Sequence, residues 1–163
     1  MCESIENFLV TFQCDRPMVP FLVKELFAIV RMVQQRFLVD TYCTTHEKNP
    51  LKAKLRDVQH YLTPQKIDLG RNANKVLKDL FEAGEVTIKQ VEEMKIQCRC
   101  GMIRFVEKIY NKSPADHKLA LNMDCMDPVL IAKNPTVAIQ HFEMPLQCFS
   151  EASILSSPGF EMP

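Results

Sequence analysis

The sequence contains no tryptophan and only 4 glycines among its 163 residues. Compact β folds reverse the chain often, and many of their tight turns require glycine. The strict alternation of apolar and polar residues that is typical of half-buried strands is also weak throughout the chain. Apolar residues recur mostly at three- and four-residue steps instead, and this spacing predicts an all-α protein.

A long uncharged apolar run is missing as well. A membrane-spanning helix needs about 18 such residues, whereas the apolar patch around Phe27 is interrupted by Lys24 and Arg31. Glu3 and Glu6 interrupt the amino-terminal stretch, so it does not resemble a secretory signal. We therefore expect an intracellular protein, nuclear or cytoplasmic, that is not secreted and does not cross a membrane.

Motifs that carry enzymatic chemistry are absent from the sequence. The glycines are isolated, so they form no phosphate-binding loop, and no G-x-S-x-G signature surrounds a serine. Cys98 and Cys100 are the pair of cysteines that most resembles a metal site, but a two-residue step on a helix separates two side chains by about 200°. We expect no catalytic residue, no metal and no cofactor, and we interpret the 7 scattered cysteines as reduced thiols.

The clearest helix in the sequence runs from Thr87 to Asn111. Thr87 and Gln90 have the spacing of a capping box, in which each side chain bonds a free backbone N–H at a helix start. The apolar residues that follow fall on one side of this helix: Ile88, Val91, Cys98, Met102, Phe105, Val106 and Ile109. Other segments must cover such a stripe. The sequence therefore predicts an irregular helical bundle of about five to seven helices organised around the long helix 87–111.

Shorter apolar patterns predict the surrounding helices. They cover residues 4–13, 18–41, 51–62, 71–83, 128–133 and 137–142. Asp127 is a favoured N-cap residue before Pro128, and Gly84 suits the left-handed backbone just past a helix end. The short link after Gly84 favours an antiparallel pair of helices. We expect one domain over residues 4–142 and a flexible tail over 143–163, where prolines and serines are frequent.

The net charge is zero, but the charges are unevenly distributed along the chain. Residues 48–112 contain 14 Lys and Arg against 8 Asp and Glu, and the remaining residues contain 6 against 12. This basic middle either attracts a polyanion or packs against the acidic ends. The best candidates for nucleic-acid phosphate contacts are Lys52, Lys54, Arg56, Arg71, Lys75 and Lys78. The last three are spaced to form one row along a helix.

Six short phrases occur in a particular order: FL at 8–9, CDRPMVPFL at 14–22, IDLG at 67–70, KSP at 112–114, DCMDP at 124–128 and AKNP at 132–135. In this order, over about residues 5–136, they resemble the helical region of hAT-superfamily transposases and of host genes derived from them. The resemblance implies the α-helical insertion of such a transposase without its ribonuclease-H-like catalytic domain and without its dimerisation segment. The family uses an insertion tryptophan to stabilise a flipped base, and this chain has no tryptophan.

Three interpretations of the function remain open at this point. The leading one is a non-catalytic fragment, resembling a transposase insertion, that binds an unknown protein partner through its helical faces. The second is a nucleic-acid-binding remnant that uses the basic segment 48–112. The third is a reading frame without selected function.

Overall fold

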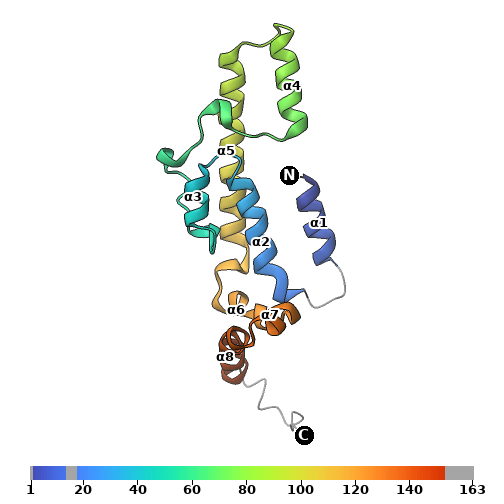
Figure 1. Cartoon of the computed structure of the whole chain (residues 1–163), viewed down its shortest axis with the longest axis vertical. Coiled ribbons are helices and arrows are strands. Elements are labelled where there is room, and N and C mark those ends of the chain that lie inside the picture. The colour runs from blue at the N-terminus through green and yellow to red at the C-terminus, as the bar shows by residue number, and fades with distance from the viewer. Residues whose placement is uncertain (1, 14–17, 153–163) are drawn as a thin grey trace. The chain divides into compact units, whose positions relative to one another are not determined.

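The computed structural model describes residues 2–13 and 18–152 (Figure 1). Within these residues the fold is all-α, as predicted, and strand pairing is limited to one isolated bridge between Leu38 and Tyr61. Eight α-helices are described, one more than the predicted upper number: α1 (Cys2–Phe12), α2 (Val19–Gln34), α3 (Asp40–Thr45), α4 (Arg71–Glu82), α5 (Ile88–Lys112), α6 (Lys118–Asn122), α7 (Pro128–Lys133) and α8 (Pro135–Glu151). No helix in these ranges is both long enough and apolar enough to cross a membrane.

Two stretches to which the sequence analysis assigned a meaning lie outside the described residues. They are residues 14–17, which belong to one of the phrases on which the proposed resemblance rests, and residues 153–163, from the predicted tail.

Contacts within the chain define two compact units, where the sequence predicts a single domain over 4–142. Unit 1 consists of Met1–Leu9 and Leu26–Lys112, and unit 2 consists of Val10–Glu25 and Ser113–Pro163. One division falls where α5 ends. Pro114 has no N–H to donate to the helix, and the Ser113 side chain accepts a hydrogen bond from the Ala115 N–H over 3.4 Å. The helix stop that the sequence predicts at this point is therefore also a boundary between units.

The second half of α5 carries the core of unit 1. Its buried side chains pack with residues from α2 and from the segments that follow it, and the cluster contains Val30, Val33, Phe37, Leu38, Cys43, Ile67, Met102, Ile103 and Val106. The predicted apolar stripe of the long helix is buried only in this half. Val106 is 1% exposed, whereas Ile88, from the same stripe, is 61% exposed.

The helix predicted over 18–41 is wrong in its second part, because the chain leaves the helix after Gln34. The backbone N–H of Leu62 donates to the Phe37 carbonyl over 2.8 Å, and the Val39 N–H donates to the His60 carbonyl over 2.9 Å. These bonds to a distant segment replace the bonds of a continuous helix. A separate short helix, α3, then begins at Asp40.

The helix predicted over 51–62 is also wrong. The chain forms two 3-10 turns here, η1 (Pro50–Lys52) and η2 (Val58–His60), and the side chains of Asn49 and Asp57 cap them by accepting from backbone N–H groups. The apolar residues of this segment still pack against the core of unit 1: Leu51, Leu55, Tyr61 and Leu62. Apolar spacing alone does not distinguish this capped, irregular path from a helix.

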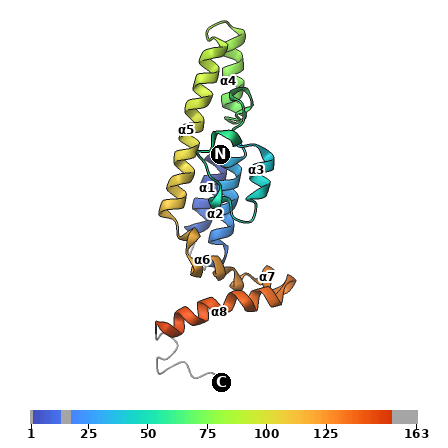
Figure 2. The same ribbon diagram turned by 90° about the vertical axis from the view of Figure 1, so that its left-hand side faces the viewer.

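The antiparallel pair of α4 and α5 is confirmed, and both views show the two helices side by side (Figure 2). Gly84 has a φ of 74°, and the N–H of Glu85 donates to the Leu80 carbonyl over 3.0 Å, which closes α4 with a Schellman motif. The capping box is confirmed too. The Thr87 N–H donates to Gln90 Oε1 over 2.8 Å, and the Gln90 N–H donates to Thr87 Oγ1 over 3.3 Å.

In unit 2 the predicted start of α7 is confirmed, because the Asp127 side chain accepts from the Val129 N–H over 2.8 Å. The tail predicted from residue 143 is wrong up to Glu151. Helix α8 replaces the short helix predicted over 137–142 and continues to Glu151, with Pro145 inside it. A proline removes one helical hydrogen bond, but Pro145 is buried. Its apolar contacts within the folded unit offset that loss, which the sequence did not show.

Two glycine substitutions test the hairpin with opposite signs. A Cβ atom added at Gly84 meets no atom within 4 Å, so the substitution is unfavourable only because Ala must adopt a left-handed backbone conformation. We therefore expect Gly84→Ala to lower the free energy of unfolding by about 1–2 kcal/mol. Ala at Gly101, inside α5, also meets nothing within 4 Å, and we expect it to raise the free energy of unfolding by about 0.5–1 kcal/mol. Denaturant unfolding measures both changes in the free energy of unfolding. Changes of the same sign would contradict the left-handed conformation of Gly84 or the helical conformation of Gly101.

Candidate functional site

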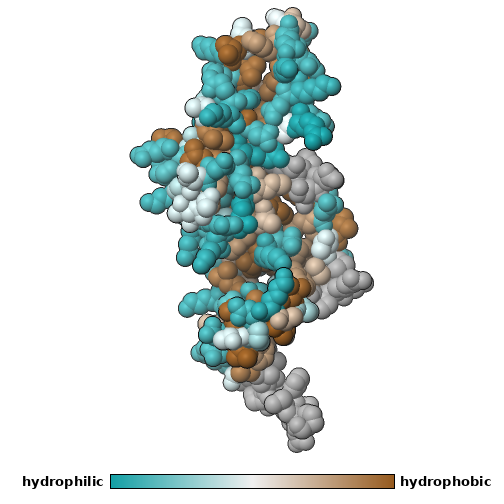
Figure 3. All heavy atoms as spheres, in the orientation of Figure 1, coloured by the Kyte–Doolittle hydropathy of each residue, from teal (hydrophilic) through white to brown (hydrophobic). Residues whose placement is uncertain are grey.

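A shallow groove between α4 and the first turns of α5, here called the hairpin groove, is an apolar candidate site. It has a volume of about 230 Å³ and is lined by Asn74, Leu77, Lys78, Phe81, Ile88, Val91 and Lys95. Figure 3 shows hydrophobic side chains at the surface of this hairpin, between the polar outer faces of the two helices. Of the residues of α4, Leu77 alone is buried.

Large apolar side chains remain in water along this groove. Phe81 is 48% exposed and Ile88 is 61% exposed. Two helices without a third neighbour cannot cover both of their apolar stripes. The hairpin therefore presents a continuous apolar surface of the kind that marks interaction sites.

The charges at the hairpin groove have one sign. Its lining includes two lysines and no carboxylate. Lys95 Nζ donates to the Gln65 carbonyl over 2.8 Å, and Lys78 Nζ lies 3.5 Å from a Glu82 carboxylate oxygen on the same helix. The pair of Lys78 with Glu82 is exposed and is therefore weak. The two lysines, here called the lysine rim, therefore place positive charge at the edge of the hairpin groove.

A cluster of polar groups, the Asp68 cluster, fixes the start of α4. The Asp68 carboxylate accepts from the Gly70 N–H over 2.8 Å and from Asn74 Nδ2 over 2.7 Å, and Arg36 Nη1 lies 3.6 Å away. The Gly70 hydrogen bond is the largest cause that lowers the pKa of Asp68 below its ordinary value of 3.8. Gly70 itself has a φ of 94°. These groups connect α4 to the segment after α2.

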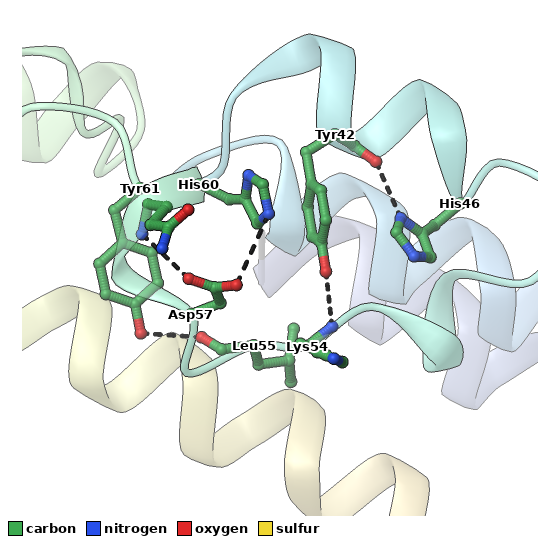
Figure 4. Close-up of polar contacts among 8 residues, drawn as sticks. Tyr42, His46, Lys54, Leu55, Asp57, His60 and Tyr61 are labelled. Carbon is green, nitrogen blue, oxygen red and sulfur yellow. Dashed lines mark hydrogen bonds and ion pairs between the residues drawn. The ribbon is translucent and has the colours of Figure 1, made fainter.

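A second candidate region is the segment of residues 46–61, which aromatic side chains fix in place (Figure 4). The Tyr42 hydroxyl accepts from the Lys54 N–H over 2.8 Å, and the Tyr61 hydroxyl donates to the Leu55 carbonyl over 2.8 Å. The ring of His60 stacks on the ring of Tyr42 with centroids 3.7 Å apart. The irregular segment is therefore well defined without a helix of its own.

Arg56 projects from this segment to α5. Its Nε and Nη2 atoms donate to the two carboxylate oxygens of Glu107 over 2.7 and 3.0 Å. These hydrogen bonds are the largest cause that lowers the pKa of Glu107, and the nearby charge of Arg104 lowers that pKa further. Arg99, five residues before Arg104 on α5, lies over the ring of Tyr61 at 4.2 Å from its centroid. Sequence reasoning missed Arg99, Arg104 and Glu107, because charges on a long helix resemble an ordinary solvated face.

The six basic residues proposed for nucleic acid do not form one surface. Lys52, Lys54 and Arg56 belong to the segment that contacts α5 near Glu107, whereas Arg71, Lys75 and Lys78 lie on α4, which packs beside Lys95. These two levels are about 18 Å apart along α5 at about 1.5 Å per residue. All six residues are exposed. Arg56 is paired with Glu107, and Lys78 with Glu82.

Residues that could hold a metal ion are not brought together in the described ranges: three or more His, Cys, Asp or Glu side chains do not converge anywhere in them. Cys98 and Cys100 both lie on α5, the first partly buried and the second exposed. His117 caps α6, where its Nδ1 accepts from the Leu119 N–H over 3.2 Å.

Comparisons of the chain with protein families, with curated proteins and with solved structures give no match.

A substitution in the Asp68 cluster tests how it supports α4. Because the pKa of Asp68 is lowered by folding, its ionised form stabilises the protein above about pH 4, and that contribution is lost as the pH falls through the lowered pKa. We expect Asp68→Asn to reduce the free energy of unfolding by about 1 kcal/mol at pH 7, a value discounted for the exposure of the side chain. The difference from the native chain should shrink as the pH falls through the lowered pKa of Asp68.

Denaturant unfolding across this pH range measures the effect. Glu93→Gln, at an exposed position on α5, is the matched control. A loss of stability that stays constant with pH would contradict a role for the Asp68 charge.

Proposed function

We propose that the chain is a non-catalytic protein-interaction module that binds an amphipathic helix of a partner protein in the hairpin groove. The observation that carries this proposal is the half-exposed apolar surface of Phe81 and Ile88 at a groove with a lysine rim. Burying such side chains gives about 25 cal/mol for each Å² removed from water. A partner helix supplies the third apolar stripe that the two helices of the hairpin lack.

The dimensions of the groove indicate how much of the partner enters it. A volume of about 230 Å³ accommodates the tips of one or two apolar side chains rather than a whole small molecule. Helices that bind in grooves insert anchors spaced three and four residues apart.

The rim indicates the charge of the partner. Lys78 and Lys95 line the groove and no carboxylate does. A helix with Asp or Glu beside its apolar anchors places those carboxylates next to the lysines, and the reversed charge is repelled. Such complementarity selects partners more than it adds affinity.

We also propose that the chain derives from the helical insertion of a hAT-type transposase. Support comes from the order of the shared phrases and from an all-α fold. Several of those phrases have local structural roles here: IDLG forms the Asp68 cluster, and KSP and DCMDP contain the helix-capping residues Ser113 and Asp127. The genomic sequence beside the coding region tests the origin, because remnants of a catalytic domain there would support it and a different flanking domain would contradict it.

Nucleic-acid binding by segment 48–112 is the second candidate, favoured by the exposure of Arg71 and Lys75 on α4. The charges of the hairpin itself argue for the first candidate. Residues 71–95 contain 5 Lys and Arg and 5 Asp and Glu, so the hairpin has no net positive charge to attract phosphates.

Selection from a displayed peptide library tests the groove. We expect the native chain to enrich peptides with apolar residues spaced three and four apart and with neighbouring Asp or Glu. The double variant Phe81→Asp, Ile88→Asp should bind the same peptides at least about tenfold more weakly, because both apolar anchors are lost.

Val58→Asp is the matched control, since Val58 is 72% exposed and does not line the groove. Circular dichroism confirms that each variant is folded. Failure to enrich any peptide class, or equal loss of binding in the control, would contradict the proposal.

A titration with duplex DNA separates the two candidate functions. For an interaction module we expect no binding at roughly 50 mM salt. Binding whose affinity falls steeply with added salt, and which Arg71→Gln weakens, would instead support the nucleic-acid interpretation. Fluorescence anisotropy of labelled DNA provides the measurement.

A further inference from the structure

We infer that a second site, independent of the hairpin groove, binds the phosphate group of a small phosphate monoester. The site is a pocket of about 240 Å³ lined by Arg56, Tyr61, Cys100, Ile103 and Arg104 and is here called the arginine pocket. Two guanidinium groups line it and no carboxylate does. Apolar walls come from Ile103 and Tyr61.

The Arg56 guanidinium has donors left for a ligand. Two of its atoms, Nε and Nη2, bond to Glu107, and a guanidinium has five N–H groups in a fixed fork. Three N–H groups therefore stay available, and Glu107 fixes the plane in which they lie. A guanidinium that is already oriented loses less side-chain entropy when it binds a phosphate.

Arg104 is the second donor. In the part of the chain that the structure describes, its guanidinium makes no hydrogen bond or ion pair, although its charge reaches Glu107. It lies on the exposed side of α5, one turn beyond Cys100. An anion between Arg56 and Arg104 receives charge-assisted hydrogen bonds from both, the arrangement that suits the several oxygens of a phosphate.

Arg99 adds positive charge behind the pocket wall. It lies over the Tyr61 ring, and the charges of both Arg99 and Arg56 act on the Tyr61 hydroxyl. Two carboxylates lie nearby as well. Glu107 neutralises one of the three arginines, and Asp57 is directed to the Gln59 N–H and to His60. The pocket therefore keeps a positive surplus.

A neighbouring cavity shows the contrast. It is larger, about 440 Å³, but its lining contains both Asp57 and Glu107 beside Lys54 and Arg56. Mixed charges of this kind do not select an anion. The apolar walls of the arginine pocket add a further requirement, because bare inorganic phosphate makes no apolar contact with the partly buried Tyr61 ring. A phosphate ester with a small ring satisfies both parts of the pocket.

Calorimetric titration of the full chain with phenyl phosphate, and in parallel with inorganic phosphate, tests the inference. We expect phenyl phosphate to bind more tightly than inorganic phosphate. Arg104→Gln should weaken binding of phenyl phosphate about tenfold, because one charge-assisted contact is lost.

Lys89→Gln is the matched control, because it removes the same charge from α5 at an exposed position about 22 Å from Arg104 at about 1.5 Å per residue. Cys100 gives an independent measurement: phenyl phosphate should slow its alkylation by neutral iodoacetamide in the native chain and not in Arg104→Gln. Equal weakening by Lys89→Gln, unchanged affinity in Arg104→Gln, or no protection of Cys100 would overturn the inference. Neither the calorimetric result nor the alkylation result bears on the function proposed for the hairpin groove.

Discussion

The packing of the second half of α5 against α2 and the segments after it is the interaction on which unit 1 depends. Val30, Val33, Phe37 and Leu38 are fully buried there, and Val106 is 1% exposed. The covering segments reach only part of a helix that is 25 residues long. Its first turns extend beyond the core and have α4 as a neighbour. The exposed apolar surface of the hairpin groove is a direct consequence of this mismatch in length.

The two proposed sites use α5 at different levels and with different chemistry. The hairpin groove presents apolar side chains with a lysine rim, which suits a helix of another protein. The arginine pocket presents the guanidinium groups of Arg56 and Arg104, the first of them oriented by Glu107, which suits a small anion. Polar clusters stabilise each site: the Asp68 cluster fixes the start of α4, and the Tyr42 and Tyr61 hydroxyls fix the segment that carries Arg56.

The candidate residues show how much of a site sequence reasoning can find. It identified Arg56 because it counted basic residues, but it grouped Arg56 with α4 residues that the fold places elsewhere. It missed Arg104 and Glu107, because only the path of residues 46–61 brings Arg56 to them. The apolar side of the hairpin was predicted, but its exposure to solvent was not. The spacing of apolar residues in a sequence does not reveal which part of an apolar stripe other segments cover.

The sequence by itself determined the ends of several helices: the capping box of Thr87 and Gln90, the left-handed Gly84, the Ser113 stop and the Asp127 cap are all as predicted. Each depends on groups within a few residues of one another, so local chemistry is sufficient. Only the tertiary structure decided that the chain leaves the helix after Gln34, that residues 51–62 are not helical, that α8 continues to Glu151 and that two units form. In the first two of these places the apolar spacing fits more than one path. Hydrogen bonds between Val39 and His60 and between Leu62 and Phe37, together with burial, select the observed path.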